Sequence, residues 1–356
     1  MKNNYNAEDI KFTKTWQNDN VNTINYSEVK DPKLIKMRGY GIALKGYWNE
    51  QLIIMKHIPN DLKNQDKETL RQFILRLSKT NHENILNFLG ISEDLELKSY
   101  FLVLEYAGNG NLHDYLSENK NLTWPQKIKI SKEVACGLEY LHDNINMIHR
   151  NLNTKTIIIN NGKAQILNPV ISELNVDMSS SMPLQDGIGF IDPELLKDLN
   201  SQFTKSSDIY SFGMIMWSIT SGRSPFANKI TLASLIVSKN ISEDPIKDTP
   251  QAYLDLYSKC CKLNSEERPS AQDAHTQLVQ LEKTLQESRN IEIERTAVVQ
   301  VTTIAVAQND NDVPVKVLNG NNSNKLQKGL LDEKKIFKMN RFRKFLFCCN
   351  RDNCIE

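Results

Sequence analysis

The sequence lacks any long run of apolar residues. None of its 356 residues lies in a stretch that approaches the roughly 18–20 apolar residues needed to cross a bilayer. The first five residues, Met-Lys-Asn-Asn-Tyr, are polar and do not begin an apolar signal core. These absences argue against secretion and against a spanning helix, and they predict a cytoplasmic protein.

Cysteine is scarce, and neither sign of charge dominates. The six cysteines include the adjacent pairs Cys260–Cys261 and Cys348–Cys349, which suit neither a disulfide framework nor zinc-finger spacing. We therefore expect reduced thiols. The 44 basic and 43 acidic residues leave a net charge of +1, so no overall field favours a nucleic-acid partner, and none is expected.

What the sequence does contain is a change of pattern along the chain. Residues 1–24 are polar and read as a solvated N-terminal extension. Short apolar runs typical of strands follow, and one segment, Leu70–Leu77, has apolar residues at helical spacing. The strand-like runs are Leu34–Met37, Gly41–Tyr47, Gln51–His57, Ile85–Ile91 and Ser99–Glu105.

Beyond Gly110 the patterns become helical, ending with a helix over Ser270–Glu287. Strands first and helices afterwards predict an α+β fold with two lobes. The small lobe, 25–106, would hold five strands and one helix, and the large lobe, 107–287, would be mainly helical. Together they form one domain, residues 25–287.

Two further compositions follow this domain. Residues 288–333 include an Asn-rich stretch and read as a linker, and residues 334–356 form a basic, aromatic, Cys-containing tail. The Lys334–Cys349 part of the tail suits contact with an anionic membrane and palmitoylation at its two final cysteines; the alternatives are a plain tail or a docked helix. The apolar run Thr296–Gln308 either pairs with a partner's strand, packs on its own domain or extends the last helix.

Seven short motifs occur in a fixed order within the predicted domain. They are Leu52–Lys56, His82–Ile85, Phe101–Tyr106, Ile148–Leu152, Gly189–Glu194, Asp208–Gly213 and Glu267–Pro269. In this order they resemble the lysine strand, the turn after the regulatory helix, the hinge, the catalytic loop, the end of the activation segment and two large-lobe anchors of protein kinases. The chain is most similar to the tyrosine-kinase-like branch.

The resemblance also locates positions where the residues needed for catalysis are replaced. Phosphoryl transfer needs a carboxylate to orient the attacking hydroxyl, ligands for Mg²⁺ and a lysine on the phosphates. The position of the base holds Asn151, whose amide cannot accept a proton near neutral pH. The two metal positions hold Thr156 and Asn168, which carry no negative charge. No intact catalytic residue and no metal site are expected.

A vestigial nucleotide pocket follows from the same resemblance. Its residues would be Lys56, Gly41, Ala43, Ile54, Leu104, Glu105, Ala107 and Ile158. Ile54 stands where the family usually has an alanine beside the adenine ring, and overpacking of this kind costs about 1–3 kcal/mol. We expect no cofactor, with ATP bound without Mg²⁺ as the alternative. Phe73 stands where the glutamate partner of Lys56 is expected, and predicts apolar packing in its place.

The resemblance also shows which family residues are kept. Those that support the fold are present, whereas those that perform the chemistry are replaced. The resemblance implies that His149 packs in the core and that Asp208 accepts backbone hydrogen bonds from the catalytic loop. It also implies a buried ion pair between Glu194 and Arg268.

The sequence is therefore identified as a degenerate member of the kinase superfamily, a pseudokinase. The predicted function is catalytically inactive signalling by protein–protein interaction or by allosteric regulation of a partner, with an active kinase as one candidate partner. Two alternatives are a weak or unconventional ATP-dependent protein Ser/Thr/Tyr kinase and a membrane-tethered signalling effector gated by the domain.

Overall fold

The computed structural model describes most of the chain between Trp16 and Ala307. The described residues are 16, 18–37, 41–58, 67–94, 96, 99–106, 108, 110–168, 187–198, 201–226 and 243–307. Contacts divide the chain into two units, residues 1–291 and 292–356. The predictions at Ala107, at the Phe73 side chain and in the Lys334–Cys349 tail lie outside what is described.

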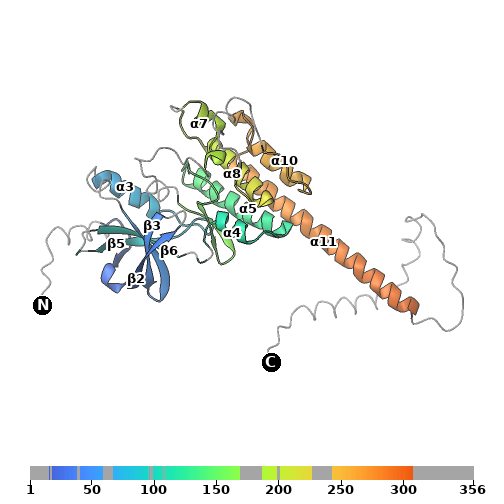
Figure 1. Cartoon of the computed structure of the whole chain (residues 1–356), viewed down its shortest axis with the longest axis horizontal. Helices are drawn as coiled ribbons and strands as arrows, with labels where there is room; N and C mark the ends of the chain where they lie inside the picture. The colour runs from blue at the N-terminus through green and yellow to red at the C-terminus, as the bar shows by residue number, and fades with distance from the viewer. Residues whose placement is uncertain are drawn as a thin grey trace. The chain divides into compact units, whose positions relative to one another are not determined.

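The small lobe is a twisted sheet with one helix, α3 (Lys67–Ser78), packed beside it (Figure 1). Its strands run in the order β1-β5-β6-β4-β3-β2. Their bounds are β1 Thr23–Asn25, β2 Lys30–Met37, β3 Gly41–Trp48, β4 Gln51–His57, β5 Phe88–Asp94 and β6 Ser99–Glu105. The α+β fold with two lobes is as predicted, but the sheet has six strands where the sequence predicted five.

The additional strand, β1, lies in the part that was predicted to be a solvated extension. It pairs in parallel with β5, and Trp16, Val21 and Ile24 around it are buried. The prediction was wrong because these three apolar residues are sparse in a polar segment and follow no regular period. The folded part of the chain therefore begins before residue 25.

Alternation along β4 gives the sheet two different faces. Ile53 and Met55 belong to a small core on one face, together with Ile24 of β1. Ile54 belongs to the main core, on the other face, and this core continues into the large lobe. The face that carries Ile54 therefore meets the part of the large lobe where the predicted site residues lie.

The large lobe is centred on α5 (Trp124–Glu139) and α8 (Lys205–Ser221), which pack against each other. Every residue of α8 from Ser207 to Thr220 is buried, as expected for a central helix that is apolar on all sides. The other elements are α4 Leu112–Glu118, β7 Ile157–Asn160, β8 Lys163–Ile166, α7 Pro193–Lys197, α10 Gln251–Cys260 and α11 Ala271–Ala307 (Figure 1).

The last helix, α11, is longer than the sequence predicted. It continues past Glu287 to Ala307, so the first part of the predicted linker is helical. The run that begins at Thr296 extends this helix, one of its three predicted fates, and forms no strand within the described residues. No helix among the described residues is both long and apolar enough to cross a membrane.

The two lobes are joined at the turn that follows α3. The sequence predicted a strand from Ile85, but β5 begins at Phe88, and the preceding residues pair instead with β8 of the large lobe. Ile166 donates its N–H to Asn84 O at 2.8 Å. Gly137 of α5 permits this approach, because a Cβ there would lie 2.7 Å from the same Asn84 oxygen.

The close approach at Gly137 predicts an effect opposite to helix propensity. Alanine in place of glycine normally stabilises a helix by up to about 1 kcal/mol. Gly137→Ala should instead lower the free energy of unfolding by about 1–3 kcal/mol, because the new methyl group overlaps a backbone oxygen. Chemical denaturation measures the change, with Ser288→Ala on the exposed side of α11 as the control. An unchanged or higher stability of Gly137→Ala would contradict the prediction.

Candidate functional site

Asp208, in the first turn of α8, holds the loop that resembles the kinase catalytic loop. Its carboxylate is 1% exposed. It accepts the N–H of His149 at 2.7 Å and the N–H of Arg150 at 2.9 Å. The ring of His142, in the π-helical turn that continues α5, lies 2.9 Å from the same carboxylate. The predicted role of Asp208 is confirmed.

His149 ties this loop to the end of β8. Its side chain is fully buried, as predicted. The N–H of Asn151 donates to Nδ1 at 3.3 Å, so the ring proton lies on Nε2, which donates to Leu167 O at 2.9 Å. Burial lowers the pKa of His149, which keeps the ring neutral. The residue after Leu167 is Asn168, which stands where the family has a metal ligand. His149 therefore fixes the backbone next to that residue.

Asn151, at the position of the base, is exposed and hydrogen-bonded to a neighbour in the loop. The Asn153 side-chain amide donates to the Asn151 side-chain oxygen at 2.9 Å and to its backbone oxygen at 3.0 Å. Asn153 Oδ1 in turn accepts the N–H of Lys155 at 2.8 Å. One asparagine side chain therefore holds the other in place.

Thr156, at the first metal position, is 5% exposed, and its hydroxyl closes the same loop. The hydroxyl oxygen accepts the N–H of Asn153 at 3.0 Å. Its single proton points at two backbone oxygens, those of Asn151 at 3.1 Å and Asn153 at 3.0 Å. Asn168, at the second position, is 1% exposed. The loop oxygens that a metal would need are therefore engaged within the loop or buried.

The apolar residues of the predicted nucleotide pocket that the structure describes are buried. Ala43, Ile54, Leu104 and Ile158 belong to one core, and each is at most 2% exposed. Ile54 lies between its register partners on β3 and β6, and Leu104 is the latter. The bulky side chain is therefore packed in the centre of the sheet.

Lys56 lies on the same face of β4 as Ile54, opposite Ala43 of β3. It is 5% exposed, and burial lowers the pKa of its ammonium to about 8. Gly41 begins β3 opposite Met37. These positions agree with a strand that resembles the lysine strand of kinases.

A contact that was not predicted fixes the hinge after β6. Asn160 at the end of β7 donates from Nδ2 to Glu105 Oε1 at 3.0 Å and to Gln165 Oε1 at 3.2 Å. Beyond Glu105, the Lys45 ammonium lies 4.2 Å from the centre of the Tyr106 ring. The hinge carboxylate is thus tied to the large lobe by an amide 55 residues away.

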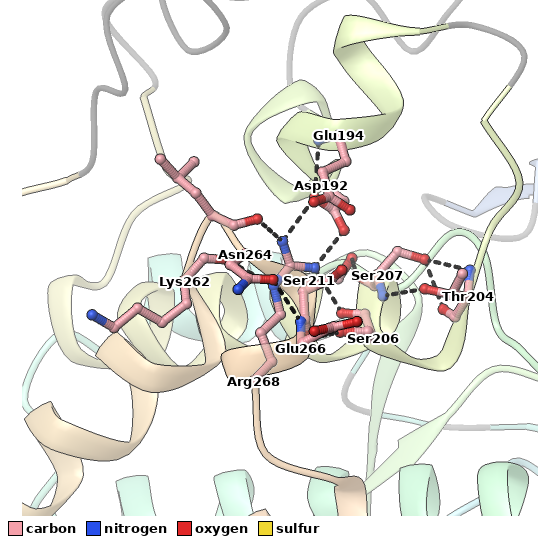
Figure 2. Close-up of polar contacts among 12 residues, drawn as sticks. Asp192, Glu194, Thr204, Ser206, Ser207, Ser211, Lys262, Asn264, Glu266 and Arg268 are labelled. Carbon is pink, nitrogen blue, oxygen red and sulfur yellow. Dashed lines mark hydrogen bonds and ion pairs between the residues drawn. The ribbon is translucent and has the colours of Figure 1, made fainter.

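The second large-lobe anchor is Arg268, which follows a 3₁₀ turn at Ser265–Glu267. Figure 2 shows its guanidinium facing the side chain of Asp192. Two nitrogens bind the two Asp192 oxygens, one of them at 3.0 Å. The same guanidinium also donates to backbone oxygens, Ser206 O at 3.0 Å and Lys262 O at 2.7 Å.

The prediction that Glu194 pairs with Arg268 was therefore wrong. Glu194 lies in the first turn of α7 and is exposed, whereas Asp192 caps that helix and is buried (Figure 2). The Asp192 Oδ1 atom accepts the N–H of Glu194 at 3.1 Å. Capping fixes the shorter carboxylate next to the arginine, and the glutamate points elsewhere.

Known proteins agree with the kinase-like fold. The family model described as protein tyrosine and serine/threonine kinase matches residues 32–278. A putative serine/threonine-protein kinase/receptor of Acanthamoeba polyphaga mimivirus is 30% identical over 258 residues, which are 70% of this chain and 15% of that protein. The serine/threonine-protein kinase VIK of Arabidopsis thaliana is 28% identical over 269 residues, 71% of this chain and 60% of VIK.

A two-lobed fold with a lysine strand, a hinge and an Asp-anchored loop defines a protein kinase domain. The chain belongs to the protein tyrosine and serine/threonine kinase family. It spans only part of its relatives: a probable serine/threonine-protein kinase of Dictyostelium discoideum, 29% identical over 259 residues, is covered over 27% of its length.

The Arg268 contacts predict which carboxylate matters for stability. Arg268→Met should lower the free energy of unfolding by about 3–5 kcal/mol, because it leaves the buried Asp192 carboxylate without its counter-charge. Glu194→Gln, at the exposed position, should change stability by no more than about 0.5 kcal/mol. Urea denaturation of both variants measures the difference. Similar losses in the two variants would contradict the assignment of Asp192.

Acid should destabilise the protein through His149. Its pKa is lowered from 6.5 by burial, so the unfolded chain binds more protons than the folded chain just below that pH. Stability present above the unfolded pKa is lost as the pH falls through it, by at most about 1.4 kcal/mol per pH unit from this group. Denaturation at about pH 7.5 and about pH 6 measures the slope. His149→Phe should show a shallower slope, and an equal slope would contradict the prediction.

Proposed function

We propose that this protein is a pseudokinase that transfers no phosphoryl group and signals by binding another protein. The observation that carries the proposal is the closed hydrogen-bond network of Asn151, Asn153 and Thr156. In a working kinase, the residues at the first and last of these positions orient the substrate hydroxyl and bind Mg²⁺. Here the Thr156 hydroxyl donates to the backbone oxygen of Asn151, and the Asn151 side-chain oxygen accepts from Asn153.

The loop cannot supply the base. Asn151 offers an uncharged amide whose oxygen already accepts a hydrogen bond from Asn153. General-base catalysis needs a group that takes up a proton near neutral pH. No side chain of this network meets that need.

The residues present do not fit Mg²⁺ either. This ion prefers charged carboxylates and near-ideal octahedral geometry. Thr156 is a neutral hydroxyl that is turned into its own loop, and Asn168 is a neutral amide that is 1% exposed. A family member with these ligands would hold the phosphates of ATP without the ion that neutralises them.

Nucleotide binding is weak or absent in this proposal. Ile54, Leu104 and Ile158, which by the family resemblance would line the adenine position, are fully buried. Lys56 is kept, but burial lowers the pKa of its ammonium to about 8, and any phosphate that it met would have no metal ion beside it. ATP held without Mg²⁺ stays the alternative.

The retained scaffold supports the protein-binding part of the proposal. Asp208, His149 and Arg268 keep the loop and the end of the activation segment in kinase-like positions. A surface of this kind suits a partner that recognises kinase shape, such as an active kinase, and we place the chain in the tyrosine-kinase-like branch by its motifs. A weak serine/threonine kinase is the second candidate, because the relatives bear that name and Lys56 is kept.

Thermal shift with nucleotide tests the proposal. With ATP at millimolar concentration, with or without Mg²⁺, the melting temperature of the wild-type protein should not rise. Ile54→Ala removes the overpacked side chain and should strengthen nucleotide binding by about 5- to 150-fold. Val103→Ala, on the other face of the sheet, is the matched control and should gain nothing.

Two outcomes would overturn the proposal. A Mg²⁺-dependent rise of several degrees in the wild-type protein would show a working metal site. Transfer of radiolabel from ATP to a generic protein substrate, lost in Lys56→Met, would establish the second candidate.

A further inference from the structure

A segment outside the matched kinase domain packs on the small lobe. The family model begins at residue 32. Trp16 and residues 18–25 precede it and lie against both the sheet and α3; we call them the N-terminal clamp. The contacts of this clamp with α3 can be tested whether or not the protein transfers a phosphoryl group.

The clamp reaches α3 through an ion pair. Arg71 of α3 binds the two carboxylate oxygens of Asp19, from Nη2 at 2.6 Å and from Nε at 2.7 Å. This fork-to-fork geometry is among the strong and specific hydrogen-bond arrangements. Hydrogen bonds from Arg71 lower the pKa of Asp19 below its usual 3.8, so the pair is charged at neutral pH. The carboxylate side is only 13% exposed.

The clamp also adds to the sheet beside β5. Ile91 donates its N–H to Asn22 O at 2.9 Å, and the Asn22 side-chain amide donates to Leu89 O at 2.9 Å. Gly90 between them makes room. It has φ +153°, and a Cβ there would lie 2.4 Å from Asn22 O. The sequence of β5 is thus adapted to receive this segment.

Apolar side chains complete the attachment. Trp16 and Val21 are each 3% exposed and belong to the same core as Ile74 and Leu77 of α3. Ile24 packs into the small core on the opposite face of the sheet. The clamp therefore touches the helix, the edge of the sheet and both of its faces.

We infer that the N-terminal clamp sets the position of α3 on the small-lobe sheet, and that its release frees the helix. In active kinases this helix is positioned by an ion pair between its glutamate and the strand lysine. In this chain that helix position is Phe73, which has no carboxylate. Asp19 of the clamp instead makes a charged contact with Arg71 of this helix.

The clamp is suited to release because it is short and lies at an edge. β1 is an edge strand of the sheet, and its pairing with β5 covers three residues. Short elements at the edge of a sheet open more readily than central strands. The helix it holds is therefore the element whose motion would report release.

Hydrogen exchange on the full chain tests the inference. Asp19→Asn removes the charge and should speed exchange of the α3 and β1 amides by about tenfold. Amides of α8 in the large lobe should keep their wild-type rates. Asp19→Glu keeps a carboxylate and should retain most of the protection, whereas general destabilisation would accelerate α8 as well and overturn the inference.

Matched variants separate the clamp from other changes in charge. Glu282→Gln removes an ion pair of similar length within the large lobe, to Lys132 at 2.5 Å, and should leave α3 unchanged. Gly90→Ala should detach β1 and speed exchange in α3 as Asp19→Asn does. Because both changes act through one segment, the double variant should exchange little faster than either alone. Two results would overturn the inference. One is a double variant whose α3 exchange is accelerated by the product of the two single effects, and the other is an α3 exchange rate that Gly90→Ala leaves unchanged.

Discussion

The arrangement of the site depends on one buried carboxylate, Asp208. It accepts two successive backbone N–H groups and lies beside the ring of His142, so the catalytic-type loop has little freedom at its start. An acceptor of this kind is costly to leave unsatisfied in the core, which makes the geometry of the loop a condition of folding. His149 then extends the constraint to the end of β8. The backbone of a kinase site is therefore kept by stability alone, whether or not its side chains perform chemistry.

That separation would allow the side chains at the catalytic positions to change while the fold is kept. His149 and Asp208, which hold the loop, are buried in the core, whereas Asn151, at the position of the base, is exposed. Asn153 and Thr156 now stabilise the loop from within, through contacts that carboxylates and a metal would otherwise disturb. An uncharged, internally bonded loop avoids the repulsion that clustered carboxylates suffer without their metal. The substitutions are thus consistent with one another, which supports a function that relies on shape.

Sequence motifs predicted the two lobes, the core position of His149 and the role of Asp208, because these depend on residue identity at fixed spacing. The six-stranded sheet was missed because β1 depends on backbone pairing and three scattered apolar residues. Spacing alone could not distinguish Asp192 from Glu194: both are acidic, and only the helix cap decides which one faces Arg268. The bond from Asn160 to Glu105 gave no signal, since an amide and a carboxylate 55 residues apart form no pattern.

The clamp and the hinge contact bear on the same physical problem. A kinase domain that binds nucleotide gains rigidity between its lobes from the ligand, since anything that binds only the folded form stabilises it. A chain that binds no nucleotide, as we propose for this one, would need that rigidity from its own residues. The hydrogen bond from Asn160 to Glu105 ties the hinge to the large lobe. Within the small lobe, the pair of Asp19 and Arg71 ties α3 to the N-terminal clamp. Both contacts join elements that are distant in sequence, so each restricts the relative motion of a pair of elements. While the clamp is in place, a partner that recognises the small lobe would meet one conformation of α3, and would bind without the cost of ordering it.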